Sequence, residues 1–126
     1  MQMKMRSSLG RVRGLGSAKD GVHHWWVQRL TAVALVPLAL WFVAALVCQV
    51  GASHASVTAW LSSPLPAIVM VLLSIATFYH AALGLQVVIE DYVSHEGLRL
   101  VAIAAMKLAC FGLAVAAIFA VLKIAL

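Results

Sequence analysis

Apolar residues fill most of the chain after residue 24, and polar residues interrupt them at few places. From Leu30 to Ile89 there is no Asp, Glu, Lys or Arg. A membrane helix needs about 20 apolar residues to cross roughly 30 Å of hydrocarbon, so this stretch is long enough for two crossings. A further apolar run begins near residue 98. The pattern predicts three membrane-spanning helices, at about 25–49, 65–91 and 98–123.

The expected connections are visible as clusters of turn-forming residues. Glycine, serine and proline gather at 51–56 and at 62–66, where they break helices and tolerate turns. Trp60 lies between the two clusters and suits the headgroup zone. A short polar stretch at 92–97 separates the second and third spans. Pro37 falls inside the first span, where a membrane helix tolerates a kink.

The composition agrees with this pattern. The 126 residues are 64% hydrophobic and only 10% charged, whereas soluble domains are about half apolar and a quarter charged. So few charges cannot cover the surface of a small soluble domain. The fold class that we expect is therefore an all-α membrane protein with one domain, residues 25–126, preceded by a basic arm, residues 1–24.

The net charge of +5 is concentrated before the first span. The basic residues there are Lys4, Arg6, Arg11, Arg13 and Lys19. A basic tail beside a span favours anionic lipid headgroups rather than nucleic acid. Lysine and arginine counts near span ends also predict orientation. They predict that the N-terminus and the 92–97 connection lie in the cytoplasm. Lys123, at the opposite end of the third span, is a small exception to this orientation.

The two cysteines, Cys48 and Cys110, lie at different expected depths in different spans. We therefore expect no disulfide between them, and their spacing does not match a metal site. Both are interpreted as small apolar residues within helices.

His80 is the first candidate for chemistry, because an ionisable group inside a span is costly. It lies roughly 16 Å below Asp91 along a helix, near the middle of the bilayer. Neutral imidazole is a good axial ligand for haem iron, but it can equally bond a neighbouring helix. Helical periodicity places Gly84 on the same side one turn away, where a flat macrocycle or a close helix could fit. A second ligand would have to come from another chain.

Three further polar positions each have two interpretations. Tyr92 and Asp91 emerge from the second span, where a tyrosine hydroxyl can donate to a quinone carbonyl, although the pair alone favours a headgroup tyrosine and a solvated acid. Arg29 could pair with a carboxylate such as a haem propionate, or extend to lipid phosphate. Lys107, about 12 Å beyond Arg99 along a helix, could reach the headgroups or pair with an acid in the bundle.

Two stretches of the chain resemble the smaller, D-type membrane anchor of succinate dehydrogenase (complex II). One is Gly21-Val22-His23 followed by Arg29 and Thr31-Ala32; the other is His80-Ala81, Gly84, Val87 or Val88, and Asp91-Tyr92-Val93. The length and the three-span layout agree with that family. The paired arginine and histidine of the companion C-type anchor are missing after Gly84, where Leu85-Gln86 stands instead.

The resemblance implies an anchor without catalytic activity of its own, forming half of a heterodimeric bundle. Its expected partners are a C-type cytochrome b anchor, an iron-sulfur subunit, a flavoprotein subunit and membrane lipid. A b-type haem would be shared between the anchors, and ubiquinone would be reduced at the boundary with the iron-sulfur subunit. The expected location is the bacterial inner membrane, or alternatively the mitochondrial inner membrane.

The resemblance also implies roles for individual residues. His80 matches the haem iron ligand, and Arg29 the arginine near the haem propionates and the quinone pocket. His23 matches a histidine near the haem, with His24 as its alternative. Tyr92 matches the tyrosine that bonds the quinone carbonyl, and Asp91 its acidic neighbour.

Three alternative functions stay open at this point. The chain could be the anchor of a fumarate reductase, a small transporter, or an assembly subunit of the membrane. A transporter would need polar residues along one path through all three spans, whereas the polar groups here gather at mid-depth and at one end. An assembly subunit would not depend on His80 or Tyr92.

Overall fold

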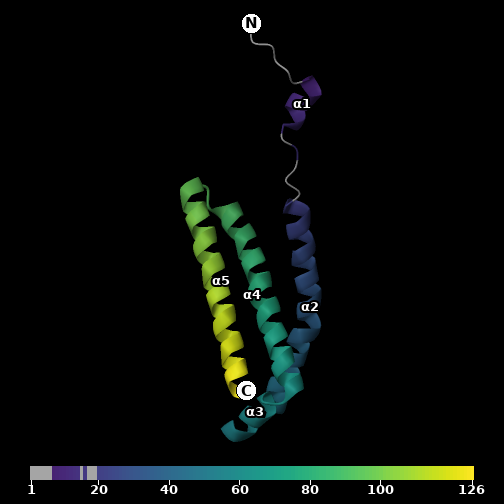
Figure 1. Cartoon of the computed structure of the whole chain (residues 1–126), viewed down its shortest axis with the longest axis vertical. Helices are drawn as coiled ribbons and strands as arrows, with labels where there is room; N and C mark the ends of the chain where they lie inside the picture. The colour runs from purple at the N-terminus through teal and green to yellow at the C-terminus, as the bar shows by residue number, and fades with distance from the viewer. Residues whose placement is uncertain (1–6, 15, 17–19) are drawn as a thin grey trace.

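The computed structural model describes residues 7–14, 16 and 20–126. The helices in these parts of the chain are α1 (Ser8–Arg13), α2 (Asp20–Cys48), α3 (His54–Leu61), α4 (Pro64–Tyr92) and α5 (Glu96–Ala125) (Figure 1). No strand occurs among the described residues. The expected all-α class is therefore confirmed.

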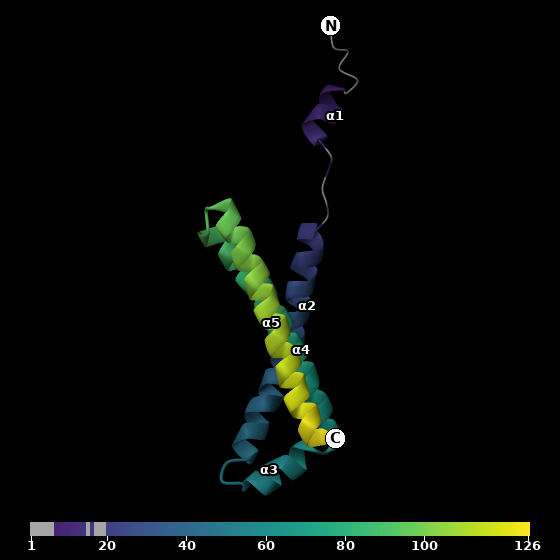
Figure 2. The same ribbon diagram turned by 60° about the vertical axis from the view of Figure 1, so that its left-hand side comes forward.

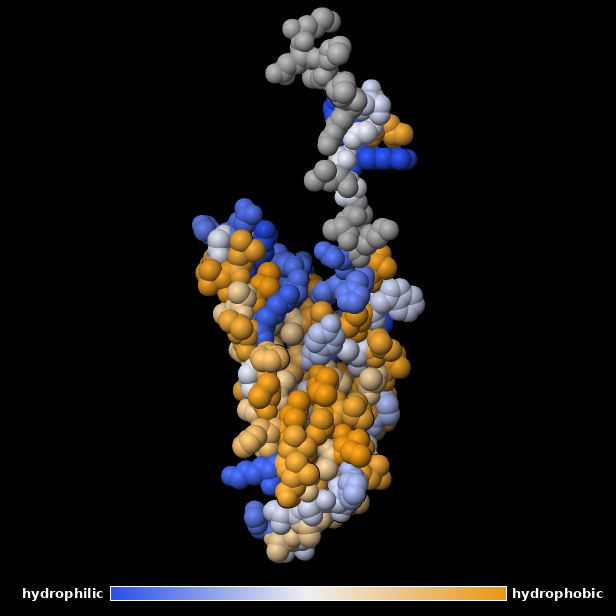
Figure 3. Space-filling model, in the orientation of Figure 1, coloured by the Kyte–Doolittle hydropathy of each residue, from blue (hydrophilic) through white to orange (hydrophobic). Residues whose placement is uncertain are grey.

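The three long helices are the expected membrane spans. Within the described residues, α2, α4 and α5 have 29, 29 and 30 residues and are apolar enough to cross a membrane. At about 1.5 Å per residue each is longer than the roughly 30 Å of hydrocarbon, so their ends extend into the headgroup regions. On the face shown in Figure 3, hydrophobic side chains form a broad band over the middle of the three long helices, and hydrophilic side chains gather toward their ends.

Helix α4 lies between α2 and α5 and packs against both (Figures 1 and 2). The most buried side chains on it are small, as membrane helices require for close approach. Ala67 is 7% exposed, and Ser74 is 8% exposed with its hydroxyl donating to the Met70 carbonyl at 2.8 Å. Most large apolar side chains are instead exposed. Their surface is therefore available to lipid or partner chains.

The connection between the first two spans contains a short helix, α3, where we expected only a turn. Gly51 has a φ of 80° and makes the turn itself, a conformation that suits a residue without Cβ. The Ser53 hydroxyl then accepts a hydrogen bond from the Ser56 amide and caps α3. Trp60 on α3 stacks on Trp41 of α2, with ring centroids 5.9 Å apart. The turn residues thus mark the ends of a helix.

The N-terminal boundary also differs from the expected arm of residues 1–24. Helix α2 begins at Asp20 rather than near residue 25, because the membrane boundary does not end a helix. An acid in the first turn suits the positive end of the helix dipole. Arg11 and Arg13 lie in the last turn of α1, whereas Lys4, Arg6 and Lys19 lie outside the described residues.

The long helices run alternately up and down. The start of α2 and the connection between α4 and α5 lie at one end of the molecule, while α3 and the C-terminus lie at the other (Figure 1). The polar residues around His23, Arg29 and Asp91 are therefore gathered toward one end, which we call the α4–α5 loop end.

Candidate functional site

His80 lies on the central helix and reaches across to α2. It is half-buried, and its Nδ1 atom is 2.9 Å from the hydroxyl oxygen of Thr31. This contact joins residues that are 49 positions apart in the chain. Helix α4 is rotated so that His80 is directed at α2. The same rotation turns the residues of α4 that share a face with His80 toward α2.

A cavity of about 410 Å³ lies over Gly84, one turn from His80 toward the α4–α5 loop end. We call it the Gly84 cavity. It is lined by Gly21, His24, Trp25, Gln28, Arg29, Gly84 and Val87. A Cβ built on Gly84 would lie 3.7 Å from Nε2 of Gln28, which is an ordinary contact. The absence of a larger side chain at this position therefore leaves the space between α2 and α4 open.

The α2 wall of the Gly84 cavity is polar. Within the described part of the chain, Nε2 of His24 and Oε1 of Gln28 are buried without a hydrogen-bond partner. Leaving a buried polar group unpaired costs about 1–3 kcal/mol, so both atoms favour a bound polar ligand. Arg29 is exposed, and its guanidinium carbon lies 4.8 Å from the centroid of the Trp25 ring. A cation at the wall favours an anionic or carbonyl-bearing group.

The structure separates the two neighbouring histidines of α2. His23 is exposed, whereas His24 is half-buried and lines the Gly84 cavity. The geometry thus brings His24, Gln28 and Arg29 together, with His80 one turn deeper. Gln28 and Thr31 were not predicted as site residues. Gln28 gives no signal beyond its place on the helical face that also carries His24, whereas Thr31 belongs to one of the two stretches that carry the family resemblance.

Asp91 and Tyr92 lie apart from this cavity, at the end of α4. Tyr92 is the last residue of the helix and is 84% exposed, and Asp91 is also exposed. The preceding acid, Glu90, accepts a hydrogen bond of 2.8 Å from the Gln86 amide. The tyrosine hydroxyl and the carboxylate of Asp91 are thus presented at the surface of the α4–α5 loop end.

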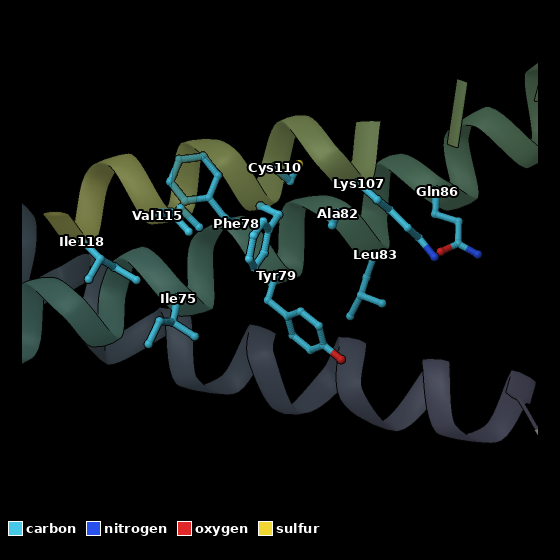
Figure 4. A pocket seen from close by; sticks show the side chains of 12 residues that line it. Ile75, Phe78, Tyr79, Ala82, Leu83, Gln86, Lys107, Cys110, Val115 and Ile118 are labelled. Carbon is cyan, nitrogen blue, oxygen red and sulfur yellow. The ribbon is translucent and has the colours of Figure 1, made fainter. Parts of the chain in front are cut away.

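A second cavity, of about 490 Å³, lies between α4 and α5 (Figure 4). Its lining is mostly apolar, and none of the predicted site residues contributes to it. Lys107 and Gln86 line one end of this cavity and extend toward each other. Lys107 is exposed there. Tyr79, the other tyrosine of the chain, also lines this cavity.

The side chains near His80 do not form a multidentate metal site. Among the described residues, no three His, Cys, Asp or Glu side chains gather to hold a metal ion. Cys48 and Cys110 are both free thiols. Any metal centre at His80 would therefore draw a further ligand from a prosthetic group or from another chain.

Comparison with known proteins places the whole arrangement in a family. A family described as succinate dehydrogenase/fumarate reductase transmembrane subunit matches residues 3–121. The chain is 39% identical over 109 residues to the succinate dehydrogenase hydrophobic membrane anchor subunit of Rickettsia bellii, which covers 86% of each chain. The subunit of the same name from Rickettsia conorii is 31% identical over 111 residues, 87% of this chain and 88% of its own length.

A third relative, matched over a shorter part of the chain, agrees with these matches. The succinate dehydrogenase hydrophobic membrane anchor subunit of Paracoccus denitrificans is 34% identical over 79 residues, 63% of this chain and 61% of its own length. These similarities confirm the resemblance found in the sequence, and with the three apolar helices they identify an integral membrane protein. The chain belongs to the family of succinate dehydrogenase/fumarate reductase transmembrane subunits, as a hydrophobic membrane anchor subunit.

Proposed function

We propose that this anchor helps to hold a b-type haem at His80 and to form a ubiquinone-reducing site near Tyr92. The observation that carries the proposal is the position of His80, directed at α2 by Thr31 and one turn below the polar Gly84 cavity. The chain would then serve succinate oxidation in the tricarboxylic acid cycle and respiratory electron transport. In a fumarate-reducing complex, the same anchor would serve electron transfer in the opposite direction, from the quinol to fumarate.

The residues at the Gly84 cavity fit the chemistry of a haem. His80 would offer an imidazole nitrogen to the haem iron, and Gly84 leaves room between α2 and α4 one turn away. The buried, unpaired Nε2 of His24 and the cation of Arg29 suit the carboxylates of haem propionates. When bound, haem supplies one-electron redox chemistry. We favour His24 over His23 as the neighbour of the haem, because His24 lines the cavity and His23 is exposed.

The exposed pair at the end of α4 suits a site completed by another subunit. A tyrosine hydroxyl can donate a hydrogen bond to a quinone carbonyl, and a nearby carboxylate can orient it or relay a proton. Tyr92 is too exposed to enclose a ligand within this chain alone. We therefore place ubiquinone between Tyr92, Asp91 and an iron-sulfur subunit that covers the α4–α5 loop end.

The proposed complex contains a flavoprotein, an iron-sulfur protein and a companion C-type anchor that supplies the second haem ligand. The basic residues before α2 support a cytoplasmic position for the loop end in a bacterial inner membrane, or a matrix position in mitochondria. The large exposed apolar surface of α2, α4 and α5 would meet lipid and the companion anchor.

Purification through an affinity tag on this chain tests the proposal directly. We expect a flavoprotein, an iron-sulfur protein and a second hydrophobic chain to co-purify, because the proposed haem and quinone sites are both completed by other subunits. A reduced-minus-oxidised optical spectrum of the same preparation should show a b-type signal. Recovery of the chain without a flavoprotein and an iron-sulfur protein would contradict the assignment to such a complex.

The size of the residue at position 84 should control haem content. Gly84→Ala should be tolerated, since the added Cβ meets only Nε2 of the flexible Gln28 side chain at 3.7 Å. Gly84→Leu should lower the haem content of the assembled complex several-fold, because its side chain fills the cavity. The ratio of haem to flavin in the purified complex measures this. Gly112→Leu on α5 is the matched control, because a Cβ at Gly112 meets no atom within 4 Å.

A further inference from the structure

The Thr31 hydroxyl has three polar neighbours, and together they determine the direction in which its proton points. Its oxygen lies 2.8 Å from the Val27 carbonyl oxygen, 3.1 Å from that of Gln28 and 2.9 Å from Nδ1 of His80. The first two contacts are the usual bonds of a threonine to the preceding turn of its own helix. Thr58 on α3 makes the same pair of bonds, each of 3.0 Å, with the His54 and Ala55 carbonyls.

Counting protons assigns the direction of each bond. A hydroxyl has one proton, and carbonyl oxygens can only accept. The proton of Thr31 is therefore directed at the Val27 and Gln28 carbonyls, and its lone pairs face His80. If Thr31 donated its proton to His80 instead, the Thr31 hydroxyl oxygen and the Val27 carbonyl oxygen would lie 2.8 Å apart without a proton between them. The atom that lies 2.9 Å away, Nδ1 of His80, must be the donor.

We propose that Thr31 is a positioning residue that holds the proton of His80 on Nδ1 and so leaves Nε2 as the iron ligand. The inference rests on the haem role proposed above for His80. A neutral imidazole carries one proton, so a protonated Nδ1 leaves a lone pair on Nε2, at the opposite edge of the ring. The hydrogen bond also fixes the ring orientation and raises the basicity of the ligand nitrogen.

Three variants of the intact complex test this role. Thr31→Val keeps the shape and removes the hydroxyl, Thr31→Ser keeps the hydroxyl, and Thr58→Val removes an equivalent hydroxyl far from His80. We expect Thr31→Val to raise the midpoint potential of the b-type haem, because a less basic ligand stabilises the ferric state less. Its affinity for haem should fall about 10–100-fold. Thr31→Ser and Thr58→Val should match the wild type in both.

Redox titration with optical detection gives the potential, and electron paramagnetic resonance of the oxidised haem reports the ligand field. A changed potential and resonance signal in Thr31→Val, restored in Thr31→Ser, would support the proposal. Loss of haem from an assembled Thr31→Val complex, with haem retained in Thr31→Ser, would support it as well. An unchanged potential and signal in Thr31→Val would overturn it, and so would equal changes in the valine and serine variants.

Two controls distinguish a failure of the Thr31 role from a failure of assembly and from a failure of the proposed haem role. If Thr31→Val does not assemble, Thr31→Ala carries the same prediction with a smaller side chain. A wild-type complex without any b-type signal would contradict the proposed haem role, and with it the premise. A wild-type complex with haem and a Thr31→Val variant indistinguishable from it would contradict only the role of Thr31.

Discussion

The His80→Ala variant should assemble with the other subunits but lose most or all of its b-type haem signal. Among the described residues, His80 is the only histidine near the middle of a long helix, and Thr31, 2.9 Å from its ring, cannot replace a nitrogen donor. The haem-to-flavin ratio and the reduced-minus-oxidised spectrum of the purified complex measure the loss. Oxidation of succinate by an artificial acceptor should continue in the assembled complex, because in the proposed electron path that acceptor takes electrons before they reach the anchor.

His54→Ala is the matched control for this substitution. His54 is an exposed histidine at the start of α3, at the end of the molecule remote from the Gly84 cavity. Its removal should leave the spectrum and the assembly unchanged. An unaltered b-type signal in His80→Ala would reject His80 as the ligand. The alternative interpretation of the sequence would then hold, in which the histidine only bonds a neighbouring helix; the structure gives Thr31 as its partner.

The membrane helices could be predicted from the sequence because one physical requirement dominates them. A span must avoid charge over about 20 residues, and the uncharged stretch from Leu30 to Ile89 meets this requirement twice. The short helix α3 was missed because its eight residues begin within one cluster of turn-forming residues, 51–56, and end just before the next, 62–66. The Ser53 hydroxyl accepts a hydrogen bond from the Ser56 amide in the first turn of α3, and the stacking of Trp60 on Trp41 holds α3 against α2.

The site was only partly predictable, for a different reason. Helical periodicity shows which residues share a face, and it placed Gly84 beside His80. It does not show which helix that face meets, so the contact with Thr31 could not be derived from spacing. The same limit applies to His23 and His24, because neighbouring residues differ by about 100° around a helix. Only the rotation of α2 against α4 shows that His24 lines the cavity.

The Tyr92→Phe variant should reduce ubiquinone slowly while oxidising succinate with an artificial acceptor at the wild-type rate. The change removes only the hydroxyl, at a side chain that is 84% exposed at the end of α4, so folding and assembly should not suffer. Loss of one hydrogen bond to the quinone carbonyl is worth about 1–2 kcal/mol, which corresponds to roughly a 5- to 30-fold loss of quinone-dependent turnover. Parallel assays with ubiquinone and with the artificial acceptor measure the two rates.

The second tyrosine of the chain supplies the control. Tyr79 lies on the same helix and lines the cavity between α4 and α5, away from the α4–α5 loop end, so Tyr79→Phe should leave both rates unchanged. An equal fall of both rates in Tyr92→Phe would indicate failed assembly. Two unchanged rates would contradict the role of the hydroxyl and leave Tyr92 as a headgroup tyrosine. A selective loss in Tyr92→Phe alone would place quinone reduction at the exposed end of α4, several turns from the haem ligand proposed on the same helix.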